Sequence, residues 1–509
     1  MAISIKRDPR FVLPVWRDFK RTLEIGELNS PSKVTKRTIP SFNLDSLTED
    51  WNENNSLFNA TDLLSGLFVS NSSETKLMNE LVEFISGNKN ATIFQKYFAK
   101  SILKKSENKD ILDQTRKIEP LLYFLHDNDI HEKIRLYKSK IIEFPNNSIL
   151  YIDLAWYYFL IGQIKQAHIY IERALILNSN NRFILRSASK FFEQIEDIEK
   201  ARDILRRSPL NKIDPWVMAS EISLSDKTEK RSSNIKRGTL LINSNNFSHF
   251  DLSELSSALG TQELRSGNRI KSKKLFTNSL ISPNSNTIAQ AEWISNEFNL
   301  FNFNPDTYEV INNFEAKVYD AFYKEDWTKS YENSLLWYYD VPYSEDAIIV
   351  GSYIAMTFLE NLNGAEELLE LGHKINPHSG AIINNLAFCK VKVNKLDEAK
   401  QIINKLEKIN IHNLKNNEII CLIATQGLIS IKSGNLESGI QLYDLAIQRA
   451  KKSNNNYLET LAKINLALEL DQSTEMKDVL VKEISSINIK PNEKDLLFLK
   501  NKLMTSLKA

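Results

Sequence analysis

The sequence predicts an all-α protein made of repeated antiparallel helix pairs. Glycine (14) and proline (13) are both scarce in the chain, as expected where helices dominate and tight turns are few. Apolar residues recur with helical spacing along most of the chain. The same arrangement of small, apolar and turn-forming residues also returns at a fixed interval, since Ala167 is as far from Ala201 as Ala365 is from Ala399.

The composition excludes several classes of protein. Lys and Arg number 65 against 64 Asp and Glu, so no global charge points to nucleic acid or to an anionic membrane. The two cysteines, Cys389 and Cys421, lie in apolar helical runs and predict buried thiols rather than a disulfide framework. No apolar run approaches the ~20 residues needed to span a bilayer. We therefore expect a cytoplasmic protein, and its abundant Asn, Lys and Ile suggest a bacterial source.

The first segment, residues 1–44, is expected to be an extended basic arm. Its prolines prevent one long helix, and the part before residue 41 carries nine basic and four acidic side chains. Residues 45–112 have helical patterns without the repeat interval, with plausible helix caps at Ser73 and Asn90. They are interpreted as a helical N-terminal cap or as diverged repeats.

The repeats follow, and each consists of a helix, a tight turn and a second helix that begins near a small residue. The small residues let the helices approach closely, and prolines such as Pro145 and Pro377 lie where one unit ends and the next begins. Residues 209–252 and 287–345 fit the period poorly and predict irregular units. The resulting division is repeats at 113–252, irregular repeats with an aromatic junction at 253–345, C-terminal repeats at 346–486 and a capping helix at 487–509.

The pattern resembles the tetratricopeptide repeat family across about residues 113–485. It is clear in "YIDLAWYYFLIGQIKQAHIYIERALILNSNN" and in "NLNGAEELLELGHKINPHS". The resemblance implies a right-handed superhelical solenoid, in which the first helix of each pair lines a concave groove that binds protein partners. Members that hold a C-terminal carboxylate use Lys, Arg and Asn side chains there. Asn384 and Asn385 match that place, but Val350 and Ala424 replace the basic residues, so this clamp is incomplete.

The helix predicted at Ile149–Ile161 is apolar on almost every side, whereas a surface helix normally has one polar face. One stripe matches the repeat core, and the resemblance places the other in the groove. The predicted partner-binding residues, from this helix and from later units, are Ile149, Ile152, Trp156, Phe159, Arg186, Lys190, Ile354, Phe358, Asn384, Phe388 and Leu428.

A large apolar patch seldom stays uncovered on a protein surface. One candidate for its cover is a partner's helix or extended peptide. Another is the chain's own arm, whose Arg10, Phe11, Trp16 and Arg17 surround the apolar stretch "FVLPVW". The third is packing between neighbouring repeats. The aromatic residues of 319–343 are interpreted as core at an irregular junction in preference to a binding surface.

No catalytic motif is present, so we expect neither an enzyme nor a cofactor. His126 and His131 are five positions apart, as are His373 and His378, which is not the spacing that presents two metal ligands on one helix face. The predicted function is a non-catalytic scaffold or adaptor that binds a partner protein. By analogy with similar arrays, it would belong to a bacterial multi-protein system for antiviral defence or signalling.

The alternative function is that of a nucleic-acid-associated subunit. In this hypothesis the basic arm contacts phosphates, with its aromatic side chains available for stacking. A second basic cluster surrounds a repeat turn and consists of Arg265, Arg269, Lys271, Lys273 and Lys274.

Overall fold

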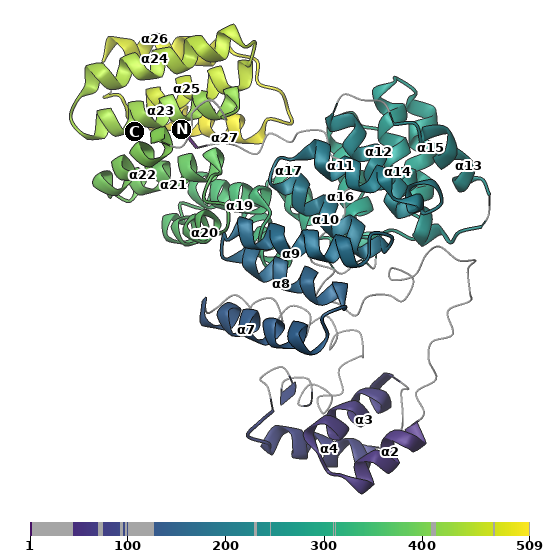
Figure 1. Cartoon of the computed structure of the whole chain (residues 1–509). Helices are drawn as coiled ribbons and strands as arrows, with labels where there is room; N and C mark the ends of the chain where they lie inside the picture. The colour runs from purple at the N-terminus through teal and green to yellow at the C-terminus, as the bar shows by residue number, and fades with distance from the viewer. Residues whose placement is uncertain are drawn as a thin grey trace. The chain divides into compact units, whose positions relative to one another are not determined.

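In the computed structural model of the chain, residues 1–2, 44–69, 75–91, 95–96, 99, 127–228, 232–244, 246–308, 310, 312–408, 414–471 and 474–507 are described. Their regular structure is helical throughout and includes no β-strand, which confirms the predicted all-α class. The chain divides into two compact units (Figure 1). One comprises residues 32–132, and the other comprises residues 1–31 and 133–509.

The smaller unit contains three described helices: α2 (Leu44–Glu53), α3 (Leu57–Val69) and α4 (Thr75–Gly87). Their apolar faces meet in a separate core that includes Leu63, Leu81 and Ile85. Trp51 is buried at the edge of this core and packs against Phe84 with 5.0 Å between ring centroids. This unit therefore has its own hydrophobic interior.

The larger unit begins with the predicted helix pairs. After α7 (Asp127–Glu143), which starts within the smaller unit, come α8 (Ser148–Leu160) and α9 (Ile164–Leu177), then α10 (Arg182–Gln194) and α11 (Ile198–Arg207). The starts of α8 and α10 are separated by the same interval as the starts of α9 and α11, and this is the interval from Ala167 to Ala201. The side chains of Asn147 and Asn181 cap α8 and α10 by accepting hydrogen bonds from backbone N–H groups in the first turn of each helix.

The middle of this unit is irregular, as the sequence predicts. Pro209 starts a 3₁₀ turn, η2 (Pro209–Lys212), and α13 has only 8 residues. The elements are α12 (Pro215–Lys227), α13 (Ile235–Ile242), α14 (His249–Arg265), α15 (Arg269–Ser279), α16 (Ser285–Phe298), η3 (Pro305–Thr307), α17 (Phe314–Tyr323) and α18 (Trp327–Asp340). The aromatic residues Tyr319, Phe322 and Trp337 are buried here, in agreement with a core role.

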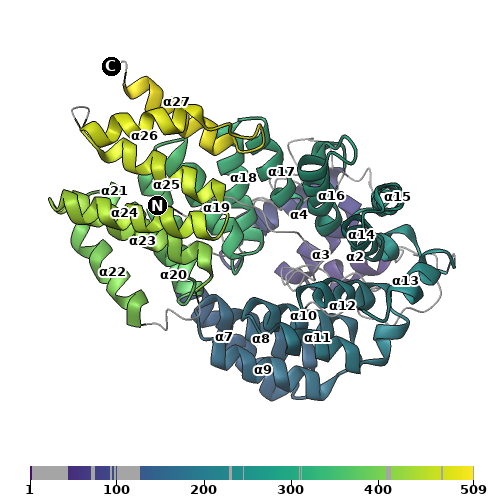
Figure 2. The ribbon, with the colours of Figure 1, turned by 90° about the horizontal axis from the view of Figure 1, so that it is seen from above.

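Regular pairs return in the C-terminal part, where the second helices α20 and α22 again start one repeat interval apart. The first helices α19, α21, α23 and α25 pack against one another. They therefore form the inner layer of the array (Figure 2). The elements are α19 (Glu345–Thr357), α20 (Leu362–Ile375), α21 (Gly380–Lys392), α22 (Leu396–Lys408), α23 (Asn416–Lys432), α24 (Leu436–Lys452), α25 (Asn456–Glu469), α26 (Glu475–Ser486) and α27 (Lys494–Ser506).

The close approach within each pair depends on its small residue. Ala167, Ala201, Ala365 and Ala399 are fully buried. We expect Ala167→Leu to overpack the α8–α9 contact and to lower the free energy of unfolding by about 1–3 kcal/mol, measured by urea denaturation. The control is Gln166→Leu at the exposed neighbouring position. Equal stability of the two variants would contradict the packing role of Ala167.

Burial of Asp153 on α8 predicts a pH-dependent stability. Burial raises the pKa of this carboxyl from 3.8 to about 7, against the opposing effects of a hydrogen bond from Tyr137 and the charge of Lys140. Since the folded-state pKa is the higher one, stability falls as the pH rises from about 4 through 7. We expect Asp153→Asn to change stability little at about pH 4 and to raise it by about 2–4 kcal/mol at about pH 8.

The measurement is the urea midpoint across this pH range, with the exposed Asp397→Asn as the control. A difference between wild type and Asp153→Asn that stays constant with pH would show that the carboxyl is not the cause.

Candidate functional site

The second apolar face of α8 is covered by the chain itself. Trp156 and Phe159 are only 2% and 1% exposed. The Phe159 ring lies 5.8 Å from that of Phe191 and 5.9 Å from that of Tyr343, which precedes α19. Gln194 at the end of α10 donates a hydrogen bond to the carbonyl oxygen of Tyr343 at 3.2 Å. The early repeats therefore pack against a segment that is several repeats further along the chain.

The turn after α8 also fits closely against that later segment. Gly162 has a φ of 70°, in the left-handed region that favours glycine. A Cβ at this position would lie 2.5 Å from the carbonyl oxygen of Lys374, near the end of α20. Both the backbone angle and the contact thus require glycine.

The predicted polar groove residues of α10 are engaged in ion pairs, of which that of Arg186 is buried and that of Lys190 is partly buried. The Nη2 atom of Arg186 lies 2.9 Å from Oε2 of Glu254, and its guanidinium lies 4.7 Å from the centroid of the Trp216 ring. Lys190 Nζ contacts Glu193 at 2.7 Å. Both side chains therefore bind inside the protein in this structure, and their role toward a partner stays a prediction.

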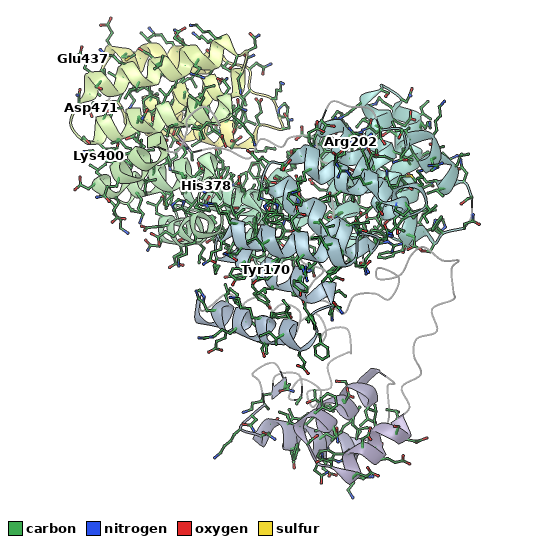
Figure 3. All side chains as sticks on the ribbon, viewed as in Figure 1. Tyr170, Arg202, His378, Lys400, Glu437 and Asp471 are labelled. Carbon is green, nitrogen blue, oxygen red and sulfur yellow. The ribbon has the colours of Figure 1, made fainter. Side chains whose placement is uncertain are left out.

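The pKa of Glu193 shows how strongly the neighbouring lysines stabilise the charged form of its carboxylate. Burial alone would raise its pKa, but the ammonium groups of Lys190 and Lys227 outweigh that effect and lower the pKa to about 2. Arg202, labelled in Figure 3, makes an equivalent buried contact on α11, with Nε 3.0 Å from Glu221. These charged side chains of α10 and α11 are thus neutralised within the protein.

Further along, α27 covers the predicted groove residues of α19. Phe358 stacks on Trp327 at 3.9 Å between centroids and meets Phe498 of α27 at 4.8 Å. The Tyr353 hydroxyl donates to Oδ2 of Asp495 at 2.9 Å. Ile354 is fully buried. The last helix of the described chain is therefore anchored by an aromatic cluster and a buried hydrogen bond.

A different contact occurs between α21 and α23, where the chain's own first residue is bound. Nδ2 of Asn384 donates to the carbonyl oxygen of Met1 at 2.8 Å. The Met1 nitrogen donates to Oγ1 of Thr425 at 2.5 Å, and the Thr425 hydroxyl lies 3.3 Å from the Met1 carbonyl oxygen. The N-terminal mark lies beside α23 in both views (Figures 1 and 2). We call Asn384 and Thr425 with their immediate surroundings the α21–α23 site.

Apolar and charged side chains surround this site. Phe388 lies one turn after Asn384, and Leu428 lies one turn after Thr425, so each pair shares a helix face. The Lys392 ammonium lies 5.5 Å from the Phe388 ring centroid. Lys392 and Lys432 both contact the buried Glu469 of α25 at 2.6 Å. These lysines are therefore neutralised by a carboxylate of the next unit.

The α21–α23 site disfavours a charged nitrogen. Burial lowers the pKa of the Met1 amine to about 4; smaller contributions come from Cys421, Lys392 and Glu469, of which only Lys392 lowers it further. Burial likewise raises the pKa of the Cys421 thiol to about 12. A nitrogen bound here is therefore uncharged near neutral pH, as a peptide N–H would be.

The structure thus distributes the predicted groove residues over four places. Arg186 and Lys190 lie on α10, paired with carboxylates. Asn384, Phe388 and Leu428 lie on the two helices of the α21–α23 site. Ile152, Trp156 and Phe159 are buried on α8, where Phe159 contacts Tyr343, and Ile149 is half-buried. Ile354 is buried on α19, and Phe358 at its end contacts Phe498 of α27. The arm residues Arg10, Phe11, Trp16 and Arg17 lie outside the described residues.

Sequence reasoning did not identify Thr425 or Met1. Thr425 carries a signal, because it is one of few polar residues within the apolar run "IICLIATQGLISI" of α23. A buried hydroxyl in such a run needs a hydrogen-bond partner. Met1 belongs to no periodic pattern, and nothing in its local sequence predicts where it binds.

The described residues also bear on the predictions about cysteines, metal ligands and membrane-spanning helices. Both cysteines are free and buried, as predicted. The described part of the chain has no group of three His, Cys, Asp or Glu side chains placed to hold a metal ion. Among the helices described, none has the length and apolar character needed to cross a membrane.

No family model matches the sequence, and no curated protein matches it. Among solved structures, the chain is similar to yeast Tom70, with 13% identity and a TM-score of 0.32 over 79% of this chain and 97% of that chain. It is also similar to the Cut9–Hcn1 hetero-tetramer of the APC/C, with 10% identity, a TM-score of 0.37 and 92% of each chain covered.

A third similar structure is the human IFIT1 dimer with PPP-AAAA, with 12% identity and a TM-score of 0.33 over 85% of this chain and 95% of that chain. These identities and TM-scores are low. The helix pairs of this chain, rather than these likenesses, define its fold.

The long-range contact of the α8–α9 turn predicts a difference between glycines. Gly267 and Gly434 also have positive φ angles, but nothing lies within 4 Å of a Cβ placed there. We expect Gly162→Ala to cost about 1–3 kcal/mol more than Gly267→Ala or Gly434→Ala, because it adds a clash with Lys374 to the backbone strain. Urea unfolding of the three variants measures this, and equal losses would mean that the turn does not rest on α20.

Proposed function

We propose that this protein is a non-catalytic scaffold that binds an extended segment of a partner protein at the α21–α23 site. The observation that carries the proposal is the bound main chain of Met1. Asn384 and Thr425 form hydrogen bonds with its main-chain nitrogen and carbonyl oxygen. Contacts of this kind are available to any peptide, so the site suits an extended partner segment of varied sequence.

The site also has the features that a peptide interface needs. It lies on the inner layer of the array, where α21 and α23 pack side by side. Phe388 and Leu428, both buried one helical turn beyond the two polar contacts, would supply apolar contacts to the bound segment. Affinity would come mainly from apolar burial, and the hydrogen bonds would set the position of the bound chain.

The wider setting of this role is a finer part of the same proposal. The resemblance to tetratricopeptide arrays and the composition favour a subunit of a bacterial multi-protein system, for antiviral defence or signalling. The residues of α10 and α19 would then stabilise the scaffold rather than contact the partner directly.

The second candidate function is association with nucleic acid. The basic side chains of the α14–α15 turn are exposed, and of these Lys271 is paired with Glu263. Contacts between lysine or arginine and phosphates weaken steeply with salt. A partner peptide held by apolar burial and main-chain hydrogen bonds would not show that salt dependence.

The test is purification from the native host with an epitope tag at the carboxyl end of the chain, which leaves the basic α14–α15 turn intact. We expect a stoichiometric partner that stays bound at high salt and that is lost with Asn384→Ala or Thr425→Val. Asn404→Ala, at an exposed position of α22, is the matched control and should retain the partner.

Two results would contradict the scaffold proposal. Retention of the partner by both site variants would place binding elsewhere. A high ratio of absorbance at 260 nm to that at 280 nm, abolished by nuclease or by salt, would favour the nucleic-acid function instead.

A further inference from the structure

The first two residues of the sequence are fully enclosed by the larger unit. Met1 is 0% exposed and Ala2 is 5% exposed. A short segment stays enclosed in this way only where specific contacts hold it. Here the contacts are the main-chain hydrogen bonds to Asn384 and Thr425. The peptide site of the proposed function is thus already occupied by a segment of the same chain.

The fit of that segment is nevertheless incomplete. Oδ1 of Asn384 is buried and has no hydrogen-bond partner among the described residues. Of the described groups, the Thr425 hydroxyl is the acceptor for the Met1 nitrogen, and no carboxylate forms an ion pair with this amine. A buried polar atom without a partner is costly. A peptide that offers a neutral backbone N–H to Oδ1 would satisfy an atom that Met1 leaves unsatisfied.

Attachment to the same chain compensates for this imperfect fit. A tethered segment is present at an effective concentration of about millimolar when its linker can span the distance. If the untethered segment binds the site with a dissociation constant of about 10 μM, the tethered segment weakens the binding of any competing free peptide roughly a hundredfold. Only a partner with a better fit, or one with several contacts, displaces the segment readily.

We propose that Met1 and Ala2 form an internal competitor that occupies the α21–α23 site until a partner peptide replaces it. This inference rests on the proposed function, since it concerns the same site. It adds a regulatory element, because the site becomes accessible to a partner peptide only when the chain's own N-terminal segment is released. The small side chain of Ala2 is required for the enclosed position, because a large charged one could not be buried there.

The experiment uses the full chain and a peptide of its residues 1–8, MAISIKRD, labelled at the carboxyl end with a fluorophore. Fluorescence anisotropy gives the dissociation constant for wild type and for Ala2→Arg, in which the chain's own segment cannot enter. We expect the peptide to bind Ala2→Arg at least tenfold more tightly than it binds wild type. Ala2→Glu should bind the peptide as tightly as Ala2→Arg does. Equal affinities would show that the sign of the added charge is not the cause of the tighter binding.

Matched controls test the site itself. Adding Asn384→Ala to Ala2→Arg should abolish peptide binding, whereas adding Asn404→Ala should leave it unchanged. The altered peptide MRISIKRD should not bind any of these variants. Circular dichroism and the urea midpoint establish that each variant is folded.

Either of two outcomes overturns the inference. The first is equal affinity of the peptide for wild type and Ala2→Arg, which would mean that the tethered segment does not occupy the site. The second is absence of binding to folded Ala2→Arg, which would mean that the site does not recognise this segment. If the partner is still lost with Asn384→Ala in the purification, the scaffold function survives either outcome and only the internal competition fails.

Discussion

A helix pair in this array has more than one apolar face, and every such face must be covered. Neighbouring pairs cover one face, and the repeat period with its buried alanines provides for that contact. The remaining inner face is covered by distant parts of the chain. Tyr343 packs on Phe159, and Phe498 packs on Phe358. These long-range contacts, more than the repeats alone, determine which surfaces of the larger unit stay available.

The two halves of the array satisfy their inner polar groups differently. On α10, Arg186 is matched by a full carboxylate charge from Glu254, and loss of either partner would leave a buried charge. On α21, Asn384 offers a neutral amide, whose donor and acceptor suit a peptide backbone. A neutral amide can exchange one bound main chain for another without exposing a buried charge. The proposed exchange of one bound segment for another is therefore better suited to α21 than to α10.

The helix pairs can be predicted from the sequence, but the distant segments that cover their inner faces cannot. The alanine period predicts the pairs because close packing restricts those positions directly. The apolar residues around Trp156 predict that this face of the helix is covered. The periodicity identifies the face, but it does not identify the segment that packs on it. Tyr343 is separated from Phe159 by far more than one repeat, so no local pattern joins them. Asn384 was predicted through the family resemblance, whereas Met1 has no pattern at all.

The contact between Met1 and Thr425 also has a consequence for biosynthesis. The two residues are 424 positions apart, so the first emerges from the ribosome long before the second exists. At about 5–20 residues per second, this interval lasts about 20–85 seconds. The N-terminal segment therefore remains undocked through most of translation. A partner present during the final part of synthesis would meet the newly folded α23 at the same moment as Met1 does.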